Sequence, residues 1–546
     1  MRFEAWLAAV RADAAARDVP GLPALVESLA TATRALREAE LEGAESAPPI
    51  AGGRPASGRG GPLTDLGGSD ATASGFAAAP ETNRRAAPSG DRAPRPAPPA
   101  GAGDLRSLET LARELRRGQL SSAALTASCL DAVARLDPEL NAFITVTADR
   151  ARAEAEAADR ELAAGRWRGP LHGIPVSVKD LVEVAGAPTT AASRVRGRQP
   201  AAADAPVVGR LVEAGAVIVG TCNLHEFAFG TTNEDSAFGP ARHPWFHDRS
   251  PGGSSGGSAV SVATGMAVAS VGTDTGGSIR IPAAACGLVG FKPGFGEVPT
   301  DGVVPLAWSL DHVGPICRTV GDATNLYRVM SGRGGHAWAP ERPRLETVRL
   351  GLLGPYFLDR LEAEVRAGFE RALEGLAGAG VRVLPREVPH AALTAPVYLH
   401  TVLAEAAAFH ARALESSPEA YTPPVRVRLE MARYVEGEDY ARARQLRAQL
   451  AREVEAALEG CDALVLPTLP ILAPRLGEST VQMDGPESVR NATLRLTQLF
   501  DLTGHPAISV PAGWTPAGLP VGLQLVGRHG GSEALLALAA ACESVL

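Results

Sequence analysis

The sequence has few of the residues that mark a secreted, metal-binding or nucleic-acid-binding protein. It contains 6 cysteines in 546 residues, and they are scattered, with no Cys-x-x-Cys pair. This distribution argues against a zinc or thiol redox motif and predicts reduced, mostly buried thiols. Lys and Arg number 53 against 61 Asp and Glu, a formal charge of −8, and no long basic run is present. We therefore expect no nucleic-acid partner.

The chain also lacks a long uninterrupted hydrophobic run. Its longest apolar stretches, around 259–271 and 535–541, are short and rich in small residues, so we expect no membrane span. The first twenty residues carry charges within their apolar stretch, unlike a signal peptide. A cytoplasmic protein with one large domain and an appendage is expected from these features.

Composition divides the chain into three parts. Residues 1–42 have apolar residues at helical spacing on both sides of a Pro20-Gly21 turn signal, which predicts a pair of helices. Residues 43–103 are rich in Pro, Gly, Ala and Ser, with hardly any large apolar residues, and predict a disordered linker. From 104 to 546, helical patterns alternate with short β-rich runs, which predicts an α/β fold around a mostly buried mixed sheet. The predicted strands are 174–178, 216–220, 268–272, 348–353, 381–384, 463–467, 507–511 and 521–526.

Glycines and small hydroxyl residues concentrate in two segments. Residues 251–258 read Pro-Gly-Gly-Ser-Ser-Gly-Gly-Ser, which in isolation is typical of a flexible linker but here is flanked by folded-looking sequence. Residues 272–280 follow an apolar run and contain a Gly-Gly-Ser turn. Such a turn can present one serine, Ser278, among free backbone N–H groups, although an ordinary β-turn is the alternative. Ser278 is therefore a candidate nucleophile.

A lysine ends the apolar strand candidate within Leu171-His172-Gly173-Ile174-Pro175-Val176-Ser177-Val178-Lys179-Asp180. If Lys179 is drawn into a dry site, desolvation disfavours its charged form and lowers its pKa, which makes it a usable base. A lysine at a strand end is more often solvated, so Lys179 becomes a candidate base only in combination with the two serine-bearing segments.

Together the three segments resemble the amidase signature family. The chain has the family's G-I-P-x-x-x-K-D, G-G-S-S-G-G-S and D-x-G-G-S-x-R motifs, in the family order and at the family intervals. The likeness runs from about Leu105 to Leu546 and includes the sequences at 291–293, 310–315 and 504–511. It implies the amidase signature fold, with helices on both faces of the sheet. It also implies hydrolysis of a small-molecule carboxylic or urea-like amide, without a metal or organic cofactor.

The same resemblance implies a triad of two serines and a lysine. Ser278 would attack the amide carbonyl, Ser254 would relay its proton, and neutral Lys179 would be the final base. The family has a cis peptide bond before the residue that corresponds to Ser254. Backbone N–H groups of Thr275, Gly276, Gly277 and Ser278 correspond to its oxyanion hole, and Ser255, Asp274 and Arg280 correspond to residues that support the triad by hydrogen bonds.

Two other pairs suggest different chemistry. Asp311-His312 invites a Ser-His-Asp interpretation, but it lies in a structural loop of the family, and adjacent residues usually point apart. His225-Glu226 suggests a metal pair but has no second histidine four residues away, so we expect no metal site there.

The sequence constrains the identity of the substrate less than it constrains the catalytic residues. The glutamine-hydrolysing A subunit of glutamyl-tRNA amidotransferase, a member of the same family, is the main alternative, and Arg428 resembles an arginine that it uses near the glutamine carboxylate. The acidic residue expected shortly before Thr497 has no counterpart in 491–496, and a tyrosine-rich stretch is missing. We therefore favour a stand-alone hydrolase of small, aryl or urea-like amides. A catalytically idle scaffold is the alternative from another class.

The N-terminal helices faintly resemble small helical partner subunits that accompany some bacterial members of the family. Two roles are open: docking on the amidase domain, or formation of a homodimer. Both predict that Trp6, Leu7, Leu25 and Leu29 bury an apolar face, because a lone short helical pair is marginal in water.

Overall fold

The computed structural model describes residues 3–17, 19–39, 95–334 and 341–546. Their strands form a mixed sheet of 11 strands in the order β1-β3-β2-β4-β6-β5-β12-β13-β9-β7-β8, with β10 and β11 as a separate pair. The strands are β1 (Phe143–Val146), β2 (Pro175–Lys179), β3 (Val217–Cys222), β4 (Ala269–Asp274), β5 (Val289–Lys292), β6 (His312–Cys317), β7 (Arg349–Leu353), β8 (Arg382–Arg386), β9 (Ala463–Pro467), β10 (Thr480–Gln482), β11 (Pro486–Ser488), β12 (Ala507–Trp514) and β13 (Pro520–Val526).

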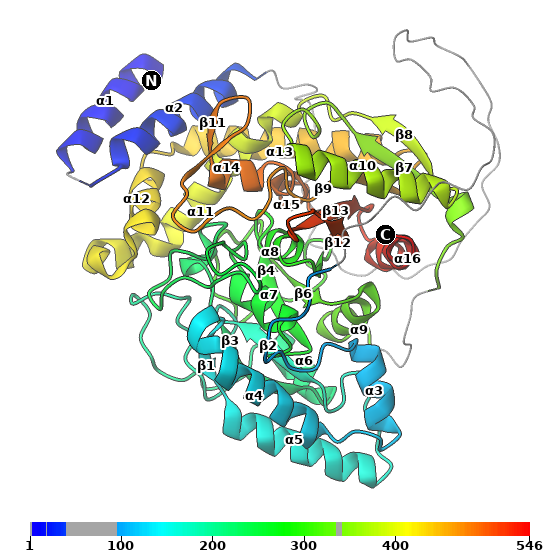
Figure 1. Cartoon of the computed structure of the whole chain (residues 1–546). Coiled ribbons are helices and arrows are strands. Elements are labelled where there is room, and N and C mark those ends of the chain that lie inside the picture. The colour runs from blue at the N-terminus through cyan, green and yellow to red at the C-terminus, as the bar shows by residue number, and fades with distance from the viewer. Residues whose placement is uncertain (1–2, 18, 40–94, 335–340) are drawn as a thin grey trace.

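Helices surround this sheet (Figure 1). The α-helices are α1 (Phe3–Ala16), α2 (Leu22–Glu38), α3 (Leu108–Arg116), α4 (Ser122–Leu140), α5 (Ala148–Ala163), α6 (Pro206–Glu213), α7 (Gly256–Ala263), α8 (Arg280–Ala285), α9 (Val320–Met330), α10 (Ala363–Gly378), α11 (Thr394–Ser416), α12 (Pro423–Ala432), α13 (Gly437–Leu458), α14 (Val489–Leu494), α15 (Gln498–Leu502) and α16 (Ser532–Glu543). The short 3-10 helices are η1 (Glu226–Ala228), η2 (Leu345–Thr347), η3 (Ala391–Leu393) and η4 (Pro418–Ala420).

The centre of the sheet positions the candidate site. Strand β2 lies between β3 and β4 and runs parallel to both, with Val178 opposite Val271. All residues of these three strands are buried, which explains their continuous apolar runs. Because β2 and β4 are parallel, their carboxyl ends meet at one edge of the sheet. The residues that follow the two strands are thereby brought together.

The predicted α/β fold with a mixed sheet is confirmed, and each of the eight predicted strands is present. Sequence reasoning missed β1, β5, β6 and the β10–β11 pair. Strand β6 contains Gly314 and Pro315, residues that are normally depleted in strands, and its pairing with β4 and β5 holds it extended. Tertiary pairing thus overrides local propensity in this strand.

The predicted N-terminal helical pair is also confirmed, as α1 and α2. Trp6, Leu7 and Leu29 are buried and Leu25 is partly buried, in a core cluster that they share with α11, α12 and α13. Figure 1 shows α2 beside these helices. The apolar face of the pair is therefore covered by the same chain.

The last residues of the predicted linker make defined contacts, contrary to the expected disorder. Residues 43–94 lie outside the described residues, whereas 95–103 are held against the domain. The indole of Trp245 donates to Ala97 O at 3.0 Å, and the Gly103 N–H donates to Thr264 O at 2.9 Å. The guanidinium of Arg95 also lies 5.8 Å from the ring centre of Trp245. These contacts with residues distant in sequence could not be read from the composition of the linker.

One helical segment, Ala391–Ser416, is long and apolar enough to cross a membrane by length and composition alone. Of its most apolar window, 56% is buried, and the helix packs against α2, α12 and α13. This is the environment of a core helix.

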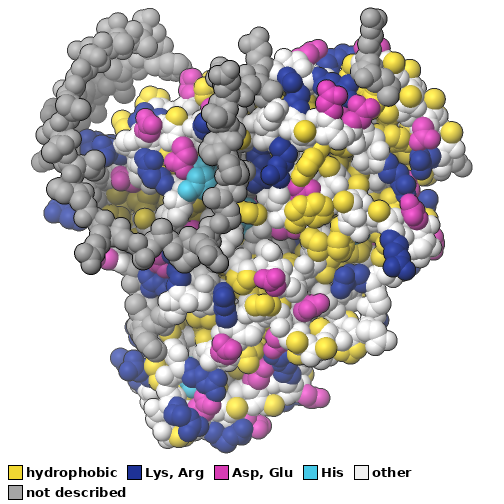
Figure 2. Space-filling view, turned by 180° about the vertical axis from the view of Figure 1, so that it is seen from behind, with side chains coloured by type: hydrophobic (Ala, Val, Ile, Leu, Met, Phe, Trp, Pro, Cys, Tyr) yellow, Lys and Arg dark blue, Asp and Glu magenta, His cyan; other side chains and the backbone are white. Residues whose placement is uncertain are grey.

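Seen from behind the view of Figure 1, basic and acidic side chains are intermixed over the surface of the molecule (Figure 2).

Candidate active site

Lys179 lies at the carboxyl end of β2 and is fully buried. Its Nζ donates to Ser254 Oγ and to Thr273 Oγ1, each at 2.7 Å. Burial lowers the pKa of Lys179 to about 7, although the charges of Asp274 and Asp311 act in the opposite direction. A large fraction of this lysine is therefore neutral near pH 7, and its lone pair can accept a proton.

Ser254 lies in the glycine-rich segment that leads into α7. The Gly253–Ser254 peptide bond is cis, as the family resemblance implies. A Cβ atom at Gly256 would lie 2.6 Å from Asn233 Oδ1, and one at Gly257 would lie 2.4 Å from a backbone oxygen. Only glycine permits such close approach, so these glycines serve packing rather than flexibility.

Ser278 lies in the turn that follows β4 and is 5% exposed. Its carbonyl oxygen accepts a hydrogen bond from the Ser255 N–H at 3.2 Å, which joins the two serine-bearing segments. Ser255 Oγ also donates to Thr273 O at 3.2 Å. The segments that carry Ser254 and Ser278 are thus in contact, and Lys179 reaches the first of them through Ser254 Oγ.

Hydrogen bonds with Asp311, Thr497 and Asp274 hold the turn. Thr275 Oγ1 donates to Asp311 Oδ1 at 2.7 Å, and Thr497 Oγ1 donates to Gly276 O at 2.6 Å. The Gly277 N–H donates to Asp274 Oδ1 at 2.6 Å, so this N–H group is already engaged. The turn is therefore held from three directions.

Asp274 and Arg280 form a fully buried ion pair beneath the turn. Arg280 Nη2 lies 3.0 Å from Asp274 Oδ1 and 2.6 Å from Asp501 Oδ2. Arg280 Nη1 also donates to Gln524 Oε1 at 2.7 Å. Burial acts to raise the pKa of Asp274, but Arg280 outweighs it and holds this pKa well below its usual range. Burial raises the pKa of Asp501 well above its usual value.

Neither of the two adjacent pairs, Asp311-His312 and His225-Glu226, acts as a unit. Asp311 accepts from Thr275 and from the backbone N–H groups of Leu306 and Ala307. The Nδ1 atom of the adjacent His312 faces Leu310 O at 2.6 Å. Asp311 and His312 therefore bind different partners, as expected for neighbouring residues in a chain.

His225 and Glu226 also diverge. His225 Nε2 lies 3.0 Å from Asp235 Oδ2, whereas Glu226 Oε2 accepts from the Thr422 N–H at 2.8 Å. Among the described residues, one other group has the ligand atoms to hold a metal ion: Glu455, His505 and His529, with these atoms within 4.8 Å of one another. None of the three belongs to the candidate triad.

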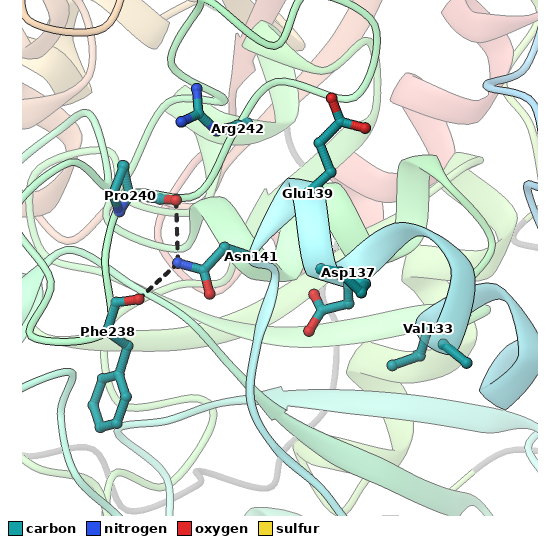
Figure 3. A pocket seen from close by; sticks show the side chains of 9 residues that line it. Val133, Asp137, Glu139, Asn141, Phe238, Pro240 and Arg242 are labelled. Carbon is teal, nitrogen blue, oxygen red and sulfur yellow. Dashed lines mark hydrogen bonds between the residues drawn. The ribbon is translucent and has the colours of Figure 1, made fainter.

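A hollow of about 600 Å³ opens beside the end of α4 (Figure 3). The side chain of Asn141 lies in it and donates to Phe238 O and Pro240 O at 2.9 and 3.2 Å. Asp137 also lines this hollow, but its carboxylate is engaged by the backbone of Ala142 and Phe143. None of the predicted site residues lines the hollow, and its polar groups hold a loop.

Sequence reasoning missed several residues that contact the site. Thr273 was overlooked because a threonine in an apolar strand carries no motif signal, yet it is the second partner of Lys179. Tyr398 comes from α11, far along the chain, and its hydroxyl lies so close to Gly276 that a Cβ atom there would be 2.5 Å away. Asp501 and Thr497 also come from distant segments. Only the folded chain brings them to the turn.

The chain is similar to known proteins in both sequence and fold. A family model described as Amidase matches residues 124–536. The A subunit of the glutamyl-tRNA(Gln) amidotransferase of Roseiflexus sp. (strain RS-1) is 38% identical over 469 residues, which cover 80% of this chain and 95% of that protein. A Pseudomonas putida protein named amidase is 39% identical over 432 residues, which cover 76% and 90%.

A solved structure described as the crystal structure of an amidase has a TM-score of 0.76 and 39% sequence identity, and the match covers 81% of this chain and 100% of that one. The family match spans most of the chain and includes every residue of the candidate site. The chain therefore belongs to the amidase family, the amidase signature enzymes that hydrolyse amides.

Proposed function

We propose that this protein is a stand-alone hydrolase of small amides, with Ser278 as nucleophile, Ser254 as proton relay and Lys179 as base. The observation that supports this assignment most strongly is the 2.7 Å contact between the buried Lys179 Nζ and Ser254 Oγ. A buried lysine whose pKa is lowered to about 7 can act as a base at neutral pH.

In the proposed reaction, the Ser278 hydroxyl attacks the amide carbonyl and passes its proton to Ser254, which passes its own proton to Lys179. The tetrahedral intermediate collapses when the proton returns through Ser254 to the leaving nitrogen, and ammonia or an amine departs. Water then attacks the acyl-enzyme by the same relay, releases the acid and restores Ser278. Protons are conserved over the cycle.

We assign the oxyanion hole to the turn from Thr275 to Ser278. The Gly277 N–H donates to Asp274 Oδ1, so the N–H groups of Thr275, Gly276 and Ser278 remain as candidate donors. Asp274, held by Arg280, would then orient the turn, and Ser255 would tie it to the Ser254 segment. Such preorganised donors typically contribute about 3 kcal/mol each to lowering the barrier.

The glutamine-hydrolysing A subunit is the main alternative, because several relatives carry that name. A glutamine site must hold an α-ammonium group as well as a carboxylate. Arg428 lies near Arg490, whose charge helps to lower the pKa of Arg428, after burial, to about 10. Two neighbouring cations repel an ammonium group, and the single carboxylate beside them in the described structure, Asp235 at 3.8 Å from Arg428, offsets only one of the two charges.

We therefore predict that the purified protein releases ammonia from glutamine more slowly than from propionamide or benzamide. Ammonia release measured with each compound at equal concentration checks this expectation. Faster release from glutamine would favour the tRNA-amidotransferase role instead.

We place the protein in the cytoplasm, because its six cysteines are all buried and unpaired. The N-terminal helices would serve as a docked part of the same chain, since α2 packs against α11, α12 and α13. A homodimer is the alternative role for this segment.

Labelling with a serine-directed fluorophosphonate tests the proposed function. Mass spectrometry of the labelled full chain should place the adduct on Ser278, and Ser278→Ala should remove both labelling and hydrolysis of a simple amide panel. An unlabelled, inactive wild-type protein would instead indicate an idle scaffold. Labelling at another serine would show that the nucleophile is misassigned.

A further inference from the structure

Two histidines and a glutamate from three segments of the chain lie together at one end of the β12–β13 pair. Glu455 is in the last turn of α13, His505 lies just before β12, and His529 lies just after β13. One ligand atom from each of the three side chains lies within 4.8 Å of the other two. Imidazole nitrogens and carboxylate oxygens are common metal ligands, so this group is a candidate metal site.

The sheet register brings the three segments to one place. Strands β12 and β13 are antiparallel, with Ala507 opposite Val526, so the residues before β12 and after β13 leave the sheet at the same end. The guanidinium of Arg528, next to His529, donates to the carbonyl oxygen of Leu458, the last residue of α13. These contacts fix the backbones of the three candidate ligands relative to one another.

The distances between the ligand atoms are close to those that a metal ion requires. Glu455 Oε1 lies 3.0 Å from His505 Nε2 and 3.8 Å from His529 Nε2. The ligand atoms of a tetrahedral zinc ion lie about 2.0–2.1 Å from the metal, and therefore roughly 3.3 Å from one another. The His529 side chain is 50% exposed, so it can rotate to close the remaining gap.

His505 has the second hydrogen-bond partner that metal-binding histidines usually have. Its Nδ1 faces Thr503 Oγ1 at 2.8 Å, while its Nε2 is directed at Glu455. With a metal ion on Nε2, the proton of the neutral ring is on Nδ1 and is donated to Thr503, which fixes the orientation of the ring. His505 is fully buried, whereas Glu455 and His529 are partly exposed, so an ion can enter from solvent.

We propose that Glu455, His505 and His529 bind a divalent transition-metal ion, with zinc as the favoured occupant. Two imidazoles and one carboxylate form a known donor set for zinc, with water in the fourth position, whereas Mg²⁺ and Ca²⁺ prefer oxygen ligands. Arg528 Nη1 lies 3.7 Å from the other carboxylate oxygen, Glu455 Oε2, which leaves Oε1 for the ion. The ion would tie the end of α13 to both strands of the hairpin, which is a structural role outside the proposed catalytic relay.

Calorimetric titration of Zn²⁺ into the tag-free, metal-stripped full chain tests the proposal. The titration should show one zinc ion bound per chain. His529→Ala and Glu455→Gln should each weaken this binding by more than about 100-fold, because the loss of a residue that only supports a ligand already costs about 10- to 100-fold. Neither change opens a cavity in the core, since both side chains are partly exposed.

His390→Ala provides the matched control. His390 Nδ1 lies 2.6 Å from Glu453 Oε1, which is also on α13, but this pair belongs to no group of three ligands in the described part of the chain. The control variant should bind zinc as tightly as the wild type. A wild-type chain that binds no zinc, or zinc binding that His529→Ala and Glu455→Gln leave intact, would overturn the proposal.

Thermal melting gives an independent readout. An ion that binds the folded chain and not the unfolded chain raises the melting temperature as its concentration increases. Zn²⁺ should therefore raise the melting temperature of the wild type and of His390→Ala, but not that of His529→Ala. Mg²⁺ at the same concentration should have no effect. An equal rise in the wild type and in His529→Ala would reject the site, as would an equal rise with Mg²⁺.

Discussion

Lys179 is one of only two lysines in the whole chain, and the other, Lys292, is buried as well. Lys292 donates to His505 O at 2.7 Å and lies 3.1 Å from His312 Nε2, a setting separate from the serines. Burial lowers the pKa of each lysine to about 7. All other strongly basic side chains are arginines, so any signal measured from lysine in this protein comes from these two interior residues.

This scarcity makes the pKa of Lys179 directly measurable. We predict that protein labelled with ¹³C at lysine Cε gives two titrating signals near pH 7, of which Lys179→Ala removes one. Because only neutral Lys179 accepts a proton, kcat/KM should rise about tenfold per pH unit below pH 7 and level off above the same pKa. A Lys179 signal that titrates near 10, or activity that falls as pH rises through 7, would contradict the role of base.

The relay makes a second prediction at the level of single residues. Ser254→Ala and Lys179→Ala should each lower kcat by roughly a thousandfold or more, and the double variant should lose little beyond the worse single one, because groups that act as a unit are non-additive. Ser258→Ala is the control, since Ser258 Oγ donates weakly to Val271 O at 3.5 Å and does not contact Lys179. Single-variant losses that multiply in the double variant would contradict a shared relay.

Among the elements, α2 has a polar edge that holds it on the amidase domain. Arg37 donates to both carboxylate oxygens of Asp439 at 2.7 Å, and only 1% of the Asp439 side chain is exposed. Thr33 Oγ1 lies 2.9 Å from His400 Nε2 in the buried interface with α11. The interface thus combines apolar packing with buried polar contacts, and the latter fix its register.

We predict that Arg37→Ala destabilises the folded protein by about 3 kcal/mol, because it leaves Asp439 buried without its partner. Arg34→Ala, on the same helix, should cost less than about 0.5 kcal/mol, since Arg34 pairs at 3.4 Å with Glu4 at an exposed surface. Urea unfolding of the two variants beside the wild type measures the difference. Equal losses would mean that α2 is not held through Arg37.

At the scale of the whole molecule, the N-terminal pair covers apolar surface of α11, the helix that also brings Tyr398 to the Ser278 turn. Removal of the pair would expose that surface. The segment 95–103 would still contact Trp245. The active-site contacts come from other segments, so they should survive. The pair is therefore expected to contribute to stability rather than to the chemistry.

Deletion of residues 1–94 should leave a protein that is labelled by fluorophosphonate at Ser278 but melts at a lower temperature or associates more. Melting, sizing and kinetics on the truncated and full chains provide the comparison. A full chain cut at a protease site inserted in 43–94 is the control, because its helices can stay docked. An inactive but folded truncation would show that the helices help to build the active site, and unchanged melting would show that they do not dock.

Much of this protein is determined by short stretches of sequence. Buried parallel strands need apolar residues on both faces, so β2, β3 and β4 stand out as continuous apolar runs. The glycine-rich segments mark places where backbones approach too closely for a side chain, and the family motifs include the serines and Lys179. Helical periodicity alone predicts α1 and α2, because a helix that packs against a core has apolar residues along one face.

Only the tertiary structure decides which distant residues complete the site. The lowered pKa of Lys179 depends on complete burial, and its contact with Thr273 depends on the parallel pairing of β2 with β4. Tyr398 and Thr497 belong to no motif in the sequence, and they reach the Ser278 turn only in the folded chain. Burial and charge balance are properties of the packed chain, so no local pattern of residues can reveal them.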